Sequence, residues 1–191
     1  MKNSSPFSVK ELSYGAFFVA LTAICAWLSI PFGQIAFTMQ TFAVFLAVSI
    51  LGTRRAFFCV LAYILLGALG APVFSGFRGG TGVLLGATGG YITGFLFAVC
   101  TAGPLLALAE KHCKRPVFLP VWQMLSLTAG LIVCYAFGSA WFLIAYAQKM
   151  TNGGALAFTL SVCVLPYILP DLAKIILAVL LSRRLGKHIT L

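Results

Sequence analysis

The chain has 191 residues, of which 61% are hydrophobic and 8% charged, and its mean hydropathy is +1.06. Soluble domains carry about 25% charged residues, so this composition excludes a soluble domain. The formal net charge is +10. Basic residues collect in the cytoplasmic loops of membrane proteins, and this explains the charge better than nucleic-acid binding does. We therefore expect an all-α, polytopic protein with one integral membrane domain over residues 1–191.

Apolar runs of about 18 or more residues with few charges predict helices that span a membrane. Six such spans are predicted, at residues 13–30, 35–53, 56–71, 85–109, 119–147 and 158–182. The third is short, and the fifth is long enough to tilt or to extend beyond the bilayer. Together they predict a bundle of six transmembrane helices.

The basic residues predict the orientation of this bundle. One side carries Lys2, Lys10, Arg54, Arg55, Lys111, Lys114, Arg115, Arg183, Arg184 and Lys187, and the other side carries Arg78 and Lys149. Cytoplasmic loops hold the excess of lysine and arginine, so ten against two predicts that both termini are cytoplasmic. The loops at 31–35, 72–84 and 148–157 then face outward.

The first span carries small residues on one face, at Ala16 and Ala20, with Ala23 extending the pattern. Small residues at a spacing of four let two helices approach closely. Two explanations remain open from the sequence. The face packs inside the bundle, or it is a docking surface for another membrane protein.

Three regions offer polar groups on the predicted outward side. Gln40, in AFTMQTF, has both a donor and an acceptor, but a simple hydrogen bond between helices explains it equally well. The segment APVFSGFRGGTGVLL places Arg78 beside Gly79 and Gly80, whose N–H groups a ligand can approach. Arg78 would suit an anion, although a solvated loop charge is the plainer explanation. Tyr91 could form an aromatic wall.

The last span contains Asp171 and Lys174 within YILPDLAKIILAVLLSRR. Asp171 lies twelve residues before Arg183, or roughly 18 Å along a helix, which places it deep in the membrane. Residues three apart share a helix face, and ionisable residues at such depth mark functional sites. The alternative is an ion pair that only holds the bundle together. Pro166 and Pro170 interrupt the segment just before the pair, which favours a site. A carboxylate and an ammonium on one face complement an amide or urea.

Other chemistry lacks the residues that it needs. There is no GxxxxGK[ST] motif for ATP, and the sequence has three acidic residues and two histidines. A single carboxylate within the spans cannot form a metal site. No serine and histidine lie at the same depth in the membrane, so a hydrolytic pair is not expected. We therefore expect no metal, no cofactor and no catalytic residue, and an intramembrane enzyme is the less favoured alternative. The six scattered cysteines have no metal or redox spacing, so disulfides are not expected.

Two motifs, GAPVFSGFRGGTGVLLGATGGYITGF and LPDLAKIILA, resemble the BioY family, the biotin-specific S components of energy-coupling factor (ECF) transporters. The resemblance covers nearly the whole chain. The Asp-x-x-Lys motif of the family falls on Asp171 and Lys174, and Gln40 matches a polar position in the second span. Where many relatives have a proline before Thr-Gly-Gly-Tyr, this chain has Ala87.

The resemblance implies six helices in a bacterial plasma membrane and an outward-facing site for biotin. It implies Asp171 and Lys174 at the ureido ring, with Gln40, Arg78, Gly79, Gly80 and Tyr91 around the ligand. The partners would be a transmembrane coupling protein, which docks on Ala16 and Ala20, and two ATPase subunits. The chain would capture its substrate without catalysis. An S component for another small vitamin remains an alternative.

Overall fold

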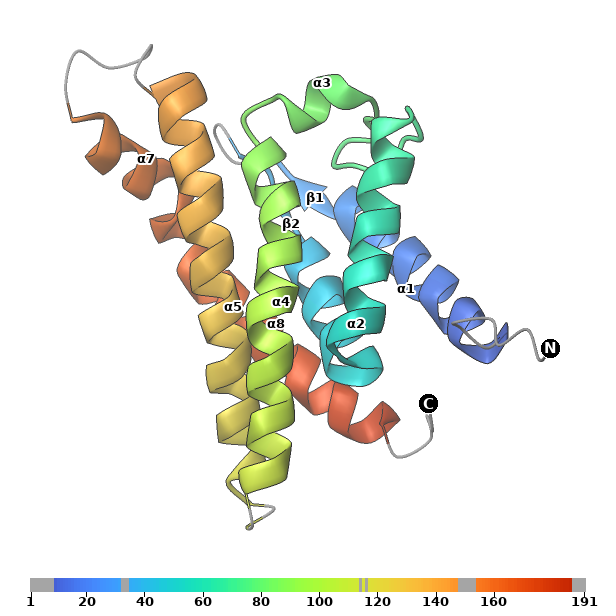
Figure 1. Ribbon diagram of the computed structural model, residues 1–191. Coiled ribbons are helices and arrows are strands. Elements are labelled where there is room, and N and C mark those ends of the chain that lie inside the picture. The colour runs from blue at the N-terminus through green and yellow to red at the C-terminus, as the bar shows by residue number, and fades with distance from the viewer. Residues whose placement is uncertain (1–8, 32–34, 114, 116, 148–153, 187–191) are drawn as a thin grey trace.

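The computed structural model describes residues 9–31, 35–113, 115, 117–147 and 154–186 (Figure 1). In chain order its elements are α1 (Val9–Trp27), β1 (Ser29–Ile30), β2 (Phe37–Thr38), α2 (Gln40–Ala68), α3 (Thr81–Leu84), α4 (Gly89–His112), α5 (Leu119–Phe142), the π-helical turn η1 (Leu143–Ala147), α7 (Ala155–Cys163) and α8 (Leu165–Leu185). Five stretches of helix in this part of the chain are long and apolar enough to cross a membrane. The predicted all-α membrane fold is confirmed.

Helix α2 consists of two helical halves, and the chain reverses direction between them. Gly52 has φ 76° and ψ 173°, which no helix contains. The Gln40 side chain donates a hydrogen bond to the Tyr63 hydroxyl at 2.6 Å. In a straight helix these two residues would be roughly 35 Å apart. The halves 40–51 and 53–68 are therefore antiparallel, as Figure 1 shows, and they supply two of the six predicted spans.

Two differences between the predicted bounds and the helices concern α2. Residues 35–39 lie outside the helix, because Phe37 and Thr38 form a two-residue strand antiparallel to Ser29 and Ile30. The chain turns at Gly52, whereas the sequence predicted the turn at residues 54–55. A glycine accepts the positive φ of the turn, and the arginines that follow it do not.

The last predicted span, 158–182, consists of two helices with a break at Val164 (φ −123°, ψ −59°). Pro166 lies in the first turn of α8, where its missing N–H costs nothing. Its ring would clash with a carbonyl one turn earlier if α7 continued. Proline thus ends α7 and starts α8, and the break lies just before the Asp171–Lys174 pair.

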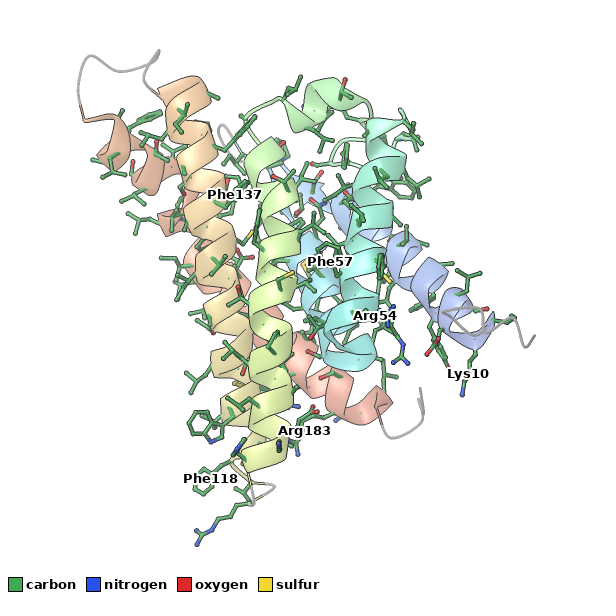
Figure 2. The ribbon with its side chains drawn as sticks, viewed as in Figure 1. Lys10, Arg54, Phe57, Phe118, Phe137 and Arg183 are labelled. Carbon is green, nitrogen blue, oxygen red and sulfur yellow. The ribbon has the colours of Figure 1, made fainter. Side chains whose placement is uncertain are left out.

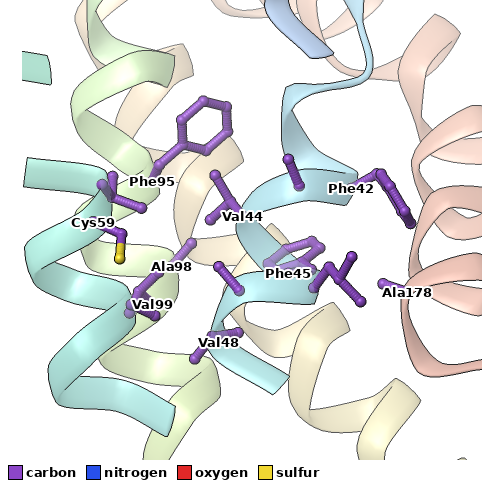
Figure 3. Packing of buried hydrophobic residues seen from close by; sticks show 14 of the residues in the cluster. Phe42, Val44, Phe45, Val48, Cys59, Phe95, Ala98, Val99 and Ala178 are labelled. Carbon is purple, nitrogen blue, oxygen red and sulfur yellow. The ribbon is translucent and has the colours of Figure 1, made fainter. Parts of the chain in front are cut away.

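The core lies where the two halves of α2 meet α4 and α8. Figure 3 shows Val44 and Val48 of α2 against Val99 of α4 on one side, with Ala178 of α8 near Phe45 on the other. Helices α4 and α5 pack along small residues, with Gly130 against Ala98 and Ala102, which lets the two backbones approach closely. A membrane gives no hydrophobic drive for helix association, so this close packing stabilises the bundle.

The two ends of the bundle differ in structure. The β1–β2 hairpin, α3 and the loop before α3 lie at the upper end in Figure 1, and α1 begins and α8 ends at the lower end. Lys10, Arg54 and Arg183 also lie at the lower end in Figure 2. Lys2, Lys114, Lys149 and Lys187, which entered the charge count, lie outside the described residues.

Gly52→Ala should destabilise the fold by about 1–3 kcal/mol, because an L-residue is strained at φ 76° and ψ 173°. Nothing lies within 4 Å of the added Cβ, so strain and not a clash is the cause. Unfolding in detergent followed by tryptophan fluorescence measures the change. Gly82→Ala is the matched control, since its Cβ also meets nothing and its φ is ordinary. Equal stability of the two variants would contradict this explanation.

Candidate functional site

The charged pair of α8 lies in the interior of the bundle. Asp171 and Lys174 are each 4% exposed, and the Lys174 Nζ is 2.7 Å from the Asp171 Oδ1. They share the inward face of α8 with Ile175, four residues after Asp171, and Ala178, four residues after Lys174. The two charges neutralise each other at a depth where a lone charge would be very costly.

Further hydrogen bonds fix both members of the pair. The Tyr135 hydroxyl of α5 donates to the Asp171 Oδ2. The Lys174 ammonium donates to the Thr38 carbonyl oxygen at 2.6 Å and lies 3.9 Å from the centre of the Phe37 ring. The pair therefore joins α8 to α5 and to the β1–β2 hairpin, and both carboxylate oxygens are engaged.

The hairpin segment is held against the site at a second point. The Tyr167 hydroxyl, one turn before Asp171 on α8, donates to the Ile35 carbonyl oxygen. Both Tyr167 and Lys174 thus bind backbone carbonyls of residues 35–38, the stretch that was predicted to be helical. Non-helical backbone within a membrane protein needs such partners, because lipid supplies none.

Gln40, the first residue of α2, lies at the centre of a second polar chain. It donates to Tyr63, whose hydroxyl donates to the Val73 carbonyl at 3.0 Å. Its Oε1 accepts a hydrogen bond from the Thr38 hydroxyl at 3.1 Å. The hydrogen bond between helices is present, and a contact of Gln40 with a ligand stays a prediction. Gln40 links the two halves of α2, and it also lines the cavity described below.

The glycine-rich segment covers the upper end of the site. Arg78 is exposed, and its Nε donates to the Ser75 carbonyl at 3.0 Å. Gly79 lies so close to the turn at Gly70 and Ala71 that an added Cβ would be 2.4 Å from the Ala71 oxygen. Gly80 has φ 92° and donates its N–H to the Gly67 oxygen at 2.7 Å. The two glycines shape the loop.

These elements enclose a cavity of about 70 Å³. Five of the predicted residues line it: Asp171, Lys174, Gln40, Arg78 and Tyr91. Tyr91 lies on α4, and its hydroxyl is 3.0 Å from the Ser139 Oγ of α5. Gly79 and Gly80 are not among the lining residues, so their contact with a ligand remains a prediction. The volume of this cavity is smaller than the roughly 300–1,000 Å³ of ordinary ligand sites. A ligand of ordinary size must therefore displace part of the lining.

Several lining residues gave no signal in the sequence. Tyr135 lies among apolar residues with no motif near it, and Tyr167, one turn before Asp171, was not singled out although its spacing places it on the same helix face. A buried tyrosine hydroxyl needs a polar partner, which is the one property that could have drawn attention to them. Thr38 takes part through its backbone carbonyl, and no residue type predicts that.

A separate groove of about 860 Å³ runs between α1 and the second half of α2. Ala16 and Ala20 line it and are exposed, whereas Ala23, which also lines it, is buried. Glu11 and Arg55 form an ion pair at this groove. The exposure of Ala16 and Ala20 favours a docking surface over packing inside the bundle.

The described residues contain no group of three or more histidine, cysteine, aspartate or glutamate side chains that could hold a metal ion. All six cysteines are free.

The fold and the site define a polytopic helical membrane protein with a small cavity at one end of its bundle, lined by apolar side chains and a few polar and charged ones. The profile of the BioY family matches residues 1–190, and the chain belongs to this family. It is 36% identical to the biotin transporter BioY of Thermotoga maritima, over 94% of this chain and 97% of that one. It is 40% identical to a probable biotin transporter BioY of Pyrococcus horikoshii, over 92% and 96% of the two chains.

A solved structure has the same fold. The crystal structure of the S-component for biotin from an ECF-type ABC transporter matches with a TM-score of 0.79 and 27% identity, over 98% of this chain and 95% of that one. The family that the sequence motifs predicted is confirmed.

Lys174→Met should destabilise the fold by about 3–5 kcal/mol, because it leaves the Asp171 carboxylate buried without its cation. The double variant Asp171→Asn/Lys174→Met should recover a large part of this loss, since no unpaired charge remains. Reversible unfolding in mixed detergent micelles measures both. A double variant less stable than the single one would show that the pair itself, and not the cost of an unpaired charge, stabilises the bundle.

Proposed function

We propose that this protein is the biotin-binding, substrate-capturing subunit of an ECF-type, ATP-driven importer. The buried Asp171–Lys174 pair within a cavity is the observation that carries the proposal. The ureido ring of biotin has N–H groups that a carboxylate accepts and a carbonyl to which an ammonium donates. The named relatives, described as biotin transporters, support biotin over other ureas and amides.

The pair can receive such a ring and keep its own contacts. A carboxylate has about four lone-pair positions, and Asp171 uses one on each oxygen for Lys174 and Tyr135. An ammonium has three donors, and Lys174 gives two of them to Asp171 and Thr38. The third is available to a ligand carbonyl. Tyr135 holds the carboxylate in place from the side of α5.

The acid tail of biotin would lie toward Arg78. This guanidinium lines the cavity at its upper end, and only its Nε–H has a hydrogen bond within the loop. The two terminal nitrogens suit a carboxylate, which arginine can bind in bidentate fashion. Gly79 and Gly80 would serve by fixing the loop that carries Arg78.

Biotin is larger than the 70 Å³ cavity, so its entry requires movement of the lining. Residues 35–38 and the loop before α3 are the irregular parts of that lining, and the buried side chains of Ile35 and Phe74 anchor them on the helices. Segments of this kind open at low cost, compared with helices in a packed bundle. We infer that they move to admit biotin and then close over it.

Uptake against a gradient needs an energy source, and binding alone supplies none. We infer that a transmembrane coupling protein docks on the groove at Ala16 and Ala20 and that two ATPase subunits hydrolyse ATP. The match to an ECF-type S-component supports such an assembly. The chain itself then captures and releases substrate without chemistry.

The bundle would lie in the plasma membrane of a bacterium with its lower end in the cytoplasm. Lys10, Arg54 and Arg183 lie at that end, and Arg78 lies at the other. The excess of basic residues supports a cytoplasmic location of the lower end, and the biotin site then faces outward.

Asp171→Asn should raise the Kd for biotin about 30-fold or more, because removal of one member of a buried charge pair costs at least ~2 kcal/mol. Calorimetry on the purified protein measures this. Glu110→Gln is the control, since it neutralises an exposed carboxylate on α4 that does not line the cavity. Unchanged affinity in Asp171→Asn would remove the pair from the site. Thiamine and riboflavin test the alternative of another vitamin, and one of them would then raise the melting temperature where biotin does not.

Ala16→Trp should leave biotin binding unchanged and abolish uptake by the assembled importer, because the indole fills the groove that the coupling protein needs. Uptake of labelled biotin by cells measures this, with binding to the purified variant beside it. Ala136→Trp is the control, because this alanine is exposed on α5 and does not line the groove. Normal uptake by Ala16→Trp would place docking elsewhere.

A further inference from the structure

The lower end of α8 carries two arginines for which the described part of the chain offers no carboxylate. The sequence has three acidic residues. Glu11 and Asp171 form ion pairs with other basic residues, and Glu110 accepts a hydrogen bond from an α5 side chain. Neither Arg183 nor Arg184 has a carboxylate partner among the described residues.

One terminal nitrogen of these guanidinium groups is also buried, although Arg183 as a whole is partly exposed. The Arg183 Nη1 has almost no contact with solvent, and it has no hydrogen-bond partner among the described residues. A buried donor of a charged group is costly to leave without an acceptor. Solvation at the surface cannot satisfy this nitrogen, and neither can the negative end of the helix dipole, because the dipole acts without a directed hydrogen bond.

The two arginines border a groove of about 430 Å³. Its other lining residues are Leu180, one turn earlier on α8, and Leu119 at the start of α5. Leu180, Arg183 and Arg184 lie three and four residues apart, so they share one side of the helix. The groove is therefore apolar toward the middle of the bundle and cationic at its end.

The surroundings place this groove at the level of lipid headgroups. Val117 and Phe118 are 79% and 52% exposed just before α5, and Trp122 is 53% exposed one turn into it. Figure 2 shows Phe118 and Arg183 at the same end of the bundle. Exposed aromatic side chains next to basic residues are typical of the membrane interface.

The geometry points to a binding site for one anionic phospholipid in the leaflet that meets this end of the bundle. Its phosphate would accept hydrogen bonds from Arg183 and Arg184, and an acyl chain would lie along Leu180 and Leu119. Phosphate offers the acceptors that arginine binds best, and basic pockets at helix ends bind anionic headgroups. This site is independent of the biotin cavity and lies at the opposite end of the bundle.

Native mass spectrometry of the delipidated full-length protein, titrated with phosphatidylglycerol or phosphatidylcholine, tests the proposal. We expect one phosphatidylglycerol to bind more tightly than phosphatidylcholine. Arg183→Gln/Arg184→Gln should weaken that binding about tenfold, since charge-assisted hydrogen bonds are lost. Arg115→Gln is the control, because it removes an exposed positive charge at the same end without touching the groove, and we expect a change below about twofold.

Three results would overturn the proposal. Equal binding of the two lipids would mean that the headgroup is not recognised. Equal weakening by Arg115→Gln would mean that only net charge matters. Sodium phosphate alone, if it raised the melting temperature as much as phosphatidylglycerol, would show a site for a free anion. Biotin affinity measured on the double variant shows whether its fold is intact, and we expect the wild-type value.

Discussion

A carboxylate and an ammonium in the interior of an apolar bundle are tolerated only while each keeps its hydrogen bonds. This constraint organises the upper half of the molecule. Asp171 needs Tyr135 and Lys174, and Lys174 needs the backbone of Thr38. Three segments far apart in the sequence are thereby brought to one point. The pair is neutral as a whole, so it can persist at this depth, and each member still has capacity for a polar ligand.

The same end of the bundle contains backbone that is not helical, and lipid cannot satisfy its polar groups. Side chains and other loop segments do so instead. Tyr167 binds the Ile35 carbonyl, Phe74 N–H bonds to the Arg78 carbonyl, and Gly80 N–H bonds to Gly67. The buried side chains of Ile35 and Phe74 pack this covering of the cavity against the helices, and a few polar contacts complete it. Such contacts can be exchanged for contacts to a ligand at low net cost.

The sequence predicted the helices and the charged pair because both depend on local composition. Runs of apolar residues define spans, and Asp171 and Lys174 stand out in one of them. The turn at Gly52 was placed two residues late, because the arginines after it are a stronger signal than one glycine in an apolar run. The strand at Phe37–Thr38 was missed for a related reason. Its residues are apolar enough to continue a helix, and the partner that fixes it, Lys174, is 136 residues away.

Tyr135 illustrates the limit for the site. Its role depends on the crossing of α5 and α8, and nothing in the neighbouring residues encodes that crossing. Gly79 shows the opposite case. Its residue type predicted that a ligand can approach its backbone, and the group that lies close to Gly79 in the structure is the turn at Gly70 and Ala71. Residue type thus predicts the kind of contact, and the fold decides the partner.

The scarcity of acidic residues connects the two ends of the molecule. The sequence has three acidic residues and thirteen lysines and arginines. A carboxylate that forms an ion pair inside the bundle cannot pair with basic residues elsewhere, so those residues depend on anions outside the protein. Asp171 is used at the cavity, and Glu11 pairs with Arg55 beside the groove of Ala16 and Ala20. A protein that docks on this groove must cover that ion pair or replace its partners. Removing a partly exposed ion pair from solvent costs free energy, and complementary charges on the docking protein would offset that cost. Under these two proposals the lower end would select its neighbours by charge, lipid at α8 and protein at α1, while the cavity at the upper end has the neutral Asp171–Lys174 pair and Arg78 in its lining.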